Sequence, residues 1–178
     1  MWTLLEGFDH LTTDEMDTLL STPVWITVLV GGADGEIDRE ERTWAERLMH
    51  MRSYSLPEPL NEYYRVVSEN FLEKLDFAMD TLPKEQEPRN AALVQKIAMA
   101  NAVLAKLDGP IAAILYQSYR TLAEETAKAS GGFLRIGAVS ASEKQWISLF
   151  MLTPVSAEGA NLYKPWEEPN GEESEEKR

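Results

Sequence analysis

The chain has 178 residues, 44% hydrophobic and 9% aromatic, and carries a formal net charge of -13. This length and apolar content predict one globular domain with a substantial core and exclude a wholly disordered chain. The absence of cysteine excludes disulfides, thiolate metal sites and cysteine nucleophiles. Because an acidic surface repels phosphate backbones, we expect no nucleic acid among the partners. The negative charge would attract basic protein surfaces or divalent cations. The alternative is that it serves only to keep the protein soluble.

The location of the protein is expected to be cytoplasmic. The first seventeen residues carry acids where a secretory signal would carry bases. The longest apolar run, residues 23–30, is far too short to cross a bilayer, so no membrane span is expected.

Helical signals dominate the first half of the chain. Residues 13–20 predict a short helix, and Thr22 and Pro23 predict the N-cap and first position of a second, buried helix. A glycine-rich turn ends that helix, and Asp38 begins the next one. Over residues 60–82, apolar side chains recur at spacings of three and four, which predicts one long amphipathic helix.

The second half continues the helical pattern. An apolar stripe of Leu93, Ile97, Ala100, Leu104 and Leu107 predicts a helical segment, and a further helix is predicted from Ile111 towards Ala129. Another helix is predicted to begin at Ser140. The sequence therefore predicts an all-α, single-domain bundle of six or seven helices over residues 1–153. Prolines and glutamates over residues 154–178 predict a flexible acidic tail.

One sequence pattern occurs twice, and it predicts an internal pseudo-repeat. The stretches 35–49 and 137–151 share a β-branched residue, a capping residue, glutamate, a base, tryptophan, a large apolar residue and methionine at equal offsets. The following pairs hold equivalent positions: Asp38 and Ser140, Glu41 and Glu143, Trp44 and Trp146, Leu48 and Phe150. Each capping residue and its glutamate predict a capping box. The tryptophan and the large apolar residue of each copy are expected on a buried stripe.

The first copy of the repeated pattern has more acidic side chains in and before it than a helix cap requires. Asp34, Glu36, Asp38 and Glu41 follow the spacing of the C-terminal half of a calcium loop, in which glycine makes the turn. An apolar residue and a glycine occupy the positions of the first two carboxylates, which excludes a complete EF-hand. We therefore name these four residues as candidate metal ligands and calcium as the candidate ion, with a solvated, capped helix start as the alternative.

Residues 33–41 and the later segment that runs from Ala129 through Glu143 together resemble the TerB-like domains associated with tellurite resistance. The resemblance covers residues 22–152. It implies an all-helical fold, a role in tellurite and stress resistance, and an acidic surface associated with calcium. On this basis Asp34, Asp38 and Glu41, with Glu36 less directly, correspond to the family's acidic motif.

The expected function is that of a non-enzymatic binding or scaffold module in stress response, with an unidentified protein partner. A calcium-binding protein that uses the turn from Asp34 to Glu41 is the alternative. An enzyme that uses paired carboxylates is a third interpretation. It is less favoured because the motif contains no histidine and the chain lacks a phosphate loop or a metalloprotease motif.

Overall fold

The computed structural model describes residues 6–32, 37–129 and 141–156. These residues form eight helices and no strand, which confirms the all-α fold class. The helices are α1 (Thr13–Gly31), α2 (Arg39–Ser55), α3 (Leu60–Glu69), α4 (Phe71–Thr81), α5 (Gln86–Ala98), α6 (Ala100–Leu104), α7 (Gly109–Ala129) and α8 (Ala141–Ile147). Only Met99 separates α5 from α6, so counting these two as one interrupted helix gives seven.

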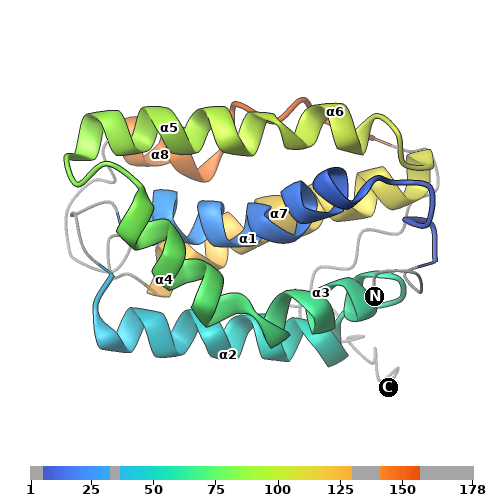
Figure 1. The fold of residues 1–178 in the computed structure, drawn as a ribbon, viewed down its shortest axis with the longest axis horizontal. Coiled ribbons are helices and arrows are strands. Elements are labelled where there is room, and N and C mark those ends of the chain that lie inside the picture. The colour runs from blue at the N-terminus through green and yellow to red at the C-terminus, as the bar shows by residue number, and fades with distance from the viewer. Residues whose placement is uncertain (1–5, 33–36, 130–140, 157–178) are drawn as a thin grey trace, which may run out of the picture.

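Helix α1 occupies the centre of the bundle (Figure 1). It packs against α7 and contacts α3 to α6 and α8, whereas α2 lies outside and packs mainly on α3. Thirteen of the 19 residues of α1 are buried, and they include nearly all of its apolar second half. A single core cluster runs from Phe8 to Leu152, so the described residues share one core.

The predicted helix boundary at Thr22 and Pro23 is wrong, because α1 continues through both residues. Thr22 does not cap a helix; its hydroxyl donates to the carbonyl oxygen of Thr18 at 2.8 Å. Pro23 has no N–H to donate to the carbonyl of Leu19, one turn earlier. The hydroxyl of Tyr63 donates to that oxygen instead, at 2.5 Å. A contact from another helix therefore makes an internal proline tolerable.

The single long helix predicted over residues 60–82 is also wrong. Asn70 has φ -125 and ψ 14, outside the helical region, and it divides the segment into α3 and α4. The apolar stripe is nevertheless buried on both sides of the break, at Tyr64, Val67, Phe71 and Leu75. Periodicity identified the buried face but not the break, because the stripe keeps its spacing across Asn70.

The two copies of the repeated pattern agree only in part. Trp44 and Trp146 are both half-buried and pack against the core. Leu48 is 2% exposed, whereas Phe150, its predicted equivalent, is 51% exposed, so the expected burial of Phe150 is wrong. Helix α8 ends at Ile147, and Leu149 follows with a φ of 47, so Phe150 lies beyond the helix, with its ring centroid 5.9 Å from that of Trp146. Ser140 lies outside the described residues.

The described chain continues beyond α8 to residue 156 without a further helix, and this segment still contacts the helical core. Asn101 Nδ2 donates to the carbonyl of Met151 at 2.8 Å, and the amide of Thr153 donates to Asn101 Oδ1 at 2.8 Å. Val155 packs against the core as a partly buried residue. The predicted tail lies outside the described residues from position 157 onward. In the part of the chain that the structure describes, no helix has the length and apolar content to cross a membrane.

Candidate functional site

The N-terminus of α2 carries the predicted capping box. The Asp38 carboxylate accepts a hydrogen bond from the Glu41 amide at 2.8 Å, and Glu41 Oε2 accepts one from the Asp38 amide at 3.0 Å. Both bonds satisfy amides that the first turn of a helix leaves without partners. The two carboxylates are therefore held in place by the helix that they begin.

The four candidate metal ligands are only partly placed by the structure. Asp34 and Glu36 lie outside the described residues. Asp38 is exposed and Glu41 is half-buried at the start of α2. Among the described residues, no group of three or more histidine or carboxylate side chains is close enough together to hold a metal ion.

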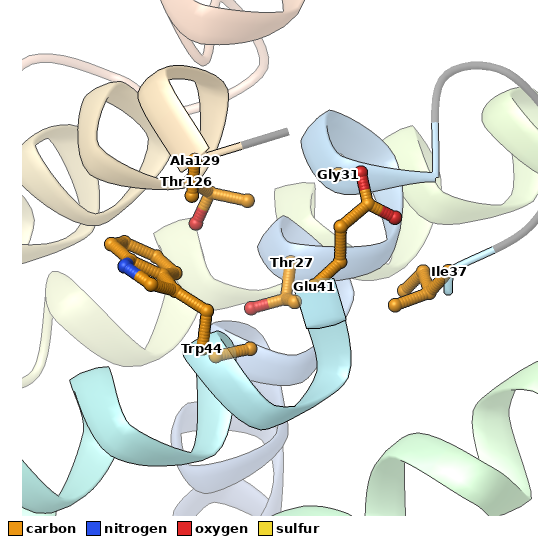
Figure 2. Close-up of a pocket in the computed structure, with 8 residues that line it drawn as sticks. Thr27, Gly31, Ile37, Glu41, Trp44, Thr126 and Ala129 are labelled. Atoms are coloured by element: carbon orange, nitrogen blue, oxygen red, sulfur yellow. The ribbon is translucent and has the colours of Figure 1, made fainter. Parts of the chain in front are cut away.

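A small cavity adjoins the turn, beside Glu41. Its volume is about 10 Å³, roughly the space that one water molecule needs. Figure 2 shows its walls coming from three helices, with Thr27 and Gly31 on α1, Glu41 and Trp44 on α2, and Thr126 on α7. The cavity thus marks the junction of α1, α2 and α7, which we call the three-helix junction.

The helix termini give the three-helix junction an electrostatic character. Helices α1 and α7 both end there, at Gly31 and Ala129, and both residues line the cavity. The C-terminus of a helix carries a partial negative charge because its last carbonyls lack intrahelical partners. The N-terminus of α2 lies at the same junction with the opposite partial charge, so the negative charge that remains there comes chiefly from the Glu41 side chain and the last carbonyls of α1 and α7.

One basic side chain already contacts this end of the molecule. The buried guanidinium of Arg89, on α5, donates from Nη2 to the carbonyl of Gly32 at 2.8 Å. Arg89 therefore satisfies one of the carbonyls at the end of α1. No pattern in the sequence identified Arg89, because an arginine near the polar start of a helix gives no signal that it is buried.

Helices α1 and α7 approach closely at the three-helix junction. A Cβ added to Gly31 would lie 3.3 Å from Thr126 Cγ2, so glycine lets the two helices approach here. The Thr126 hydroxyl is buried and makes no hydrogen bond within the described part of the chain. The cavity walls around this hydroxyl are almost entirely apolar, so a water there would have few other partners. The sequence pattern contained Ala129 but gave no indication of Thr126.

A second, open hollow lies on another part of the surface. Its volume is about 440 Å³, and Glu6, Glu58, Pro59, Glu62 and Ile111 line it. Arg65 donates to the Glu62 carboxylate at 2.6 Å, so one of the three acids already has a cationic partner. None of the candidate residues from the sequence lies in this hollow.

The comparisons with known proteins found no match. No family model, no curated protein and no solved structure is similar to this chain.

Proposed function

We propose that this chain is a non-enzymatic, cytoplasmic binding module in stress response, of the kind that TerB-like domains represent, and that its partner binds at the three-helix junction. One observation carries the proposal. The two sequence segments that resemble the TerB-like motifs are far apart in the chain, yet Gly31 and Ile37, which flank the acidic turn, line the same cavity as Ala129, where the late segment begins.

A binding role fits the acidic turn better than a catalytic one. The Asp38 and Glu41 carboxylates each accept a hydrogen bond from the amide of the other residue. Both side chains therefore already have a structural role at the start of α2. Their negative charges can attract a positively charged ligand without any proton transfer.

The ligand at the three-helix junction is expected to be positively charged. The C-terminal ends of α1 and α7, the Glu41 side chain and the net charge of -13 support a cation, against the partial positive charge of the α2 N-terminus. A lysine or arginine of a protein partner satisfies this condition. Calcium is the second candidate, with Asp34, Glu36, Asp38 and Glu41 as its ligands, and the same helix ends support it.

Calorimetry with calcium separates the two candidates. If the turn binds calcium, few ligands on an incomplete loop imply a dissociation constant of about 10⁻⁴ to 10⁻³ M. Saturation at about 100 times that constant would stabilise the fold by about 2.7 kcal/mol and raise the melting temperature. Asp34→Asn should weaken the binding, whereas Asp9→Asn, at an exposed acid elsewhere, should not. No heat at millimolar calcium contradicts the calcium candidate.

Quantitative capture of partners tests the binding module itself. The immobilised wild-type chain should retain a protein that the double variant Asp34→Asn/Glu36→Gln loses, because that variant removes charge without removing the Asp38 cap. Asp9→Asn serves again as the control and should retain the partner. Equal recovery by wild type and double variant would contradict binding at the three-helix junction.

A further inference from the structure

Arg120 on α7 is a half-buried cation without a carboxylate partner among the described residues. Its Nη1 atom reaches only the Tyr116 hydroxyl, at 3.4 Å, and its buried Nε makes no hydrogen bond. The other half-buried cations of the described chain, Arg42 and Lys74, each pair with a carboxylate, as does the buried Arg52. Because a charge that is removed from water needs compensation, we expect an anionic group to bind Arg120.

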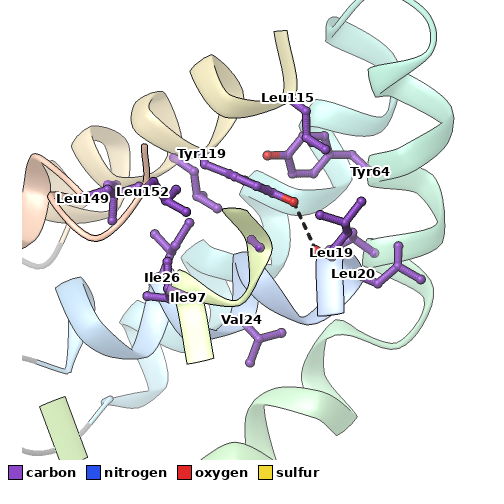
Figure 3. Packing of buried hydrophobic residues seen from close by; sticks show 14 of the residues in the cluster. Leu19, Leu20, Val24, Ile26, Tyr64, Ile97, Leu115, Tyr119, Leu149 and Leu152 are labelled. Atoms are coloured by element: carbon purple, nitrogen blue, oxygen red, sulfur yellow. Dashed lines mark hydrogen bonds between the residues drawn. The ribbon is translucent and has the colours of Figure 1, made fainter. Parts of the chain in front are cut away.

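The chain that follows α8 crosses α7 close to Arg120. Figure 3 shows Leu149 and Leu152 beside Tyr119 in the core, and all three belong to one buried cluster. Tyr119 directly precedes Arg120, so the two positions differ by only about 1.5 Å along the helix axis. Residues 148–156 therefore pass α7 at the level of Arg120.

This segment leaves an exposed apolar side chain in a stretch that carries no acid. Phe150 is 51% exposed, and its ring centroid lies 5.9 Å from that of the half-buried Trp146. Residues 144–156 contain no aspartate or glutamate. We call Trp146, Phe150 and Arg120 the Phe150 surface. Its apolar rings and its unpaired cation are complementary to a segment that carries both aromatic and acidic side chains.

We propose that residues 157–178 of the same chain dock on the Phe150 surface, with the Trp166 ring packing on Phe150 and a glutamate pairing with Arg120. The segment has the required chemistry, since it holds seven glutamates against three basic residues. Two of these glutamates, Glu167 and Glu168, directly follow Trp166. An aromatic contact at Phe150 therefore brings carboxylates towards Arg120, where an arginine–carboxylate pair is one of the stronger hydrogen-bonded contacts.

The length of the chain permits this docking. Trp166 lies ten residues after Ser156, the last described residue of this segment, and an extended chain of that length spans about 33–36 Å. Phe150 lies only six residues before Ser156, so the chain can fold back to it. Docking of this kind would limit the flexibility that the composition of residues 154–178 predicts.

Attachment to the same chain favours this occupant over a separate acidic partner. A segment joined by a short linker is present at an effective concentration in the millimolar range. A second copy of the chain, by contrast, carries its own charge of -13 and is repelled before its segment can reach the surface. The proposal therefore places the contact within one copy.

Paramagnetic relaxation enhancement in the full chain tests the docking. The chain has no cysteine, so Asn170→Cys provides one site for a nitroxide label near Trp166. At about 0.15 M salt, the label should broaden the backbone amides of residues 144–156 and those around Arg120. The amides of α2, at the opposite edge of the bundle from α8 (Figure 1), should broaden less. At about 1 M salt, where the Debye length is about 3 Å, the broadening should decrease.

One substitution on each side of the proposed contact tests the residues that make it. Arg120→Gln removes the cation, and Trp166→Ala removes the aromatic ring. Each should lower the ratio of docked to free segment by about 10-fold, as for the loss of one charged hydrogen-bonded pair or one aromatic anchor. Arg47→Gln, at an exposed arginine of α2, is the matched control and should leave the broadening unchanged. Circular dichroism checks that Arg120→Gln keeps the fold.

A mixed sample identifies which copy supplies the segment. Spin-labelled chain without an isotope label is mixed with isotope-labelled chain that carries no nitroxide. Docking within one copy predicts no broadening in this mixture, and broadening of residues 144–156 there would overturn the proposal by showing docking between copies. The proposal is also overturned if the label broadens none of these residues in its own chain, or if either Arg120→Gln or Trp166→Ala behaves like Arg47→Gln.

Discussion

The hydroxyl of Tyr63 lies 2.5 Å from the carbonyl oxygen of Leu19, and Pro23 is the reason. A residue with an N–H at position 23 would satisfy that carbonyl from within α1, but proline cannot. Tyr119 donates to the same oxygen at 3.2 Å (Figure 3), and the two hydroxyls are 3.0 Å apart. A defect in the central helix thus joins α1 to α3 and α7 through a buried hydrogen-bonded group.

Removing the Tyr63 hydroxyl should destabilise the fold. In Tyr63→Phe, the Leu19 carbonyl keeps only the longer bond from Tyr119, so we expect a loss of about 1–2 kcal/mol. Pro23→Ala restores an N–H that can reach the same carbonyl, so Tyr63→Phe should cost less in that background. Urea denaturation of the four proteins of this cycle should give a coupling of at least about 0.5 kcal/mol. Additive effects would contradict the link between Pro23 and Tyr63.

Stability should fall in alkaline solution because of the same group. Burial raises the pKa of Tyr63 and of Tyr119 well above the ordinary tyrosine value of 10.0. Above pH 10 the unfolded chain loses these protons while the folded chain keeps them. The free energy of unfolding should therefore decrease by about 1.4 kcal/mol per pH unit for each of the two tyrosines.

Urea denaturation at pH 9, 10 and 11 measures this slope. Tyr119→Phe removes one of the two groups and should flatten the decrease above pH 10. An unchanged slope in that variant would show that other residues cause the alkaline loss of stability.

Replacing Arg52 should lower the stability of the fold more than most other substitutions in the core. Arg52 is 2% exposed, donates to Glu125 at 2.6 Å and to the Ser118 carbonyl and Thr121 hydroxyl at 3.0 Å each, and so joins α2 to α7. Arg52→Met leaves Glu125 without its cation, and we expect a loss of about 3–5 kcal/mol, as for other broken buried pairs.

The double variant Arg52→Met/Glu125→Leu is the control for Arg52. It removes both charges, so it should recover part of the stability lost in Arg52→Met. Thermal denaturation of both variants measures the difference. A double variant that is less stable than Arg52→Met would contradict the assignment of the loss to an unpaired carboxylate.

Gly7 should not tolerate a side chain. Its φ is 86, and an added Cβ would lie 2.2 Å from Ile111 Cδ1. Gly7→Ala should cost about 1–2 kcal/mol from the backbone conformation, with only a small addition from the contact, because Ile111 Cδ1 is the flexible end of its side chain. Adding Ile111→Val removes the Cδ1 atom. The double variant should therefore recover only the part of the lost stability that comes from this contact.

Gly109 is the matched control for Gly7. It begins α7, and nothing lies within 4 Å of an added Cβ. Gly109→Ala should be neutral or stabilise the fold by about 0.4–1 kcal/mol, because alanine restricts the unfolded chain. Differential scanning calorimetry compares the two substitutions. Equal losses of stability in Gly7→Ala and Gly109→Ala would contradict the role assigned to the positive φ of Gly7.

Local patterns in the sequence determined the helical class, the buried faces and one cap. Leu93, Ile97 and Leu104 recur at helical spacing and are buried as expected. The Asp38–Glu41 capping box could be predicted because both partners lie within one turn. Such features depend on residues that are neighbours in the chain, and the sequence shows these directly.

Only the tertiary structure decided where helices continue, where they break and which segments meet. Pro23 stays inside α1 because tyrosines from α3 and α7 satisfy the Leu19 carbonyl. The three-helix junction brings Gly31 and Thr126 together, and no spacing in the sequence predicts that contact. The physical reason is that packing and long-range hydrogen bonds override local preference by a few kcal/mol, and their partners are distant in the chain.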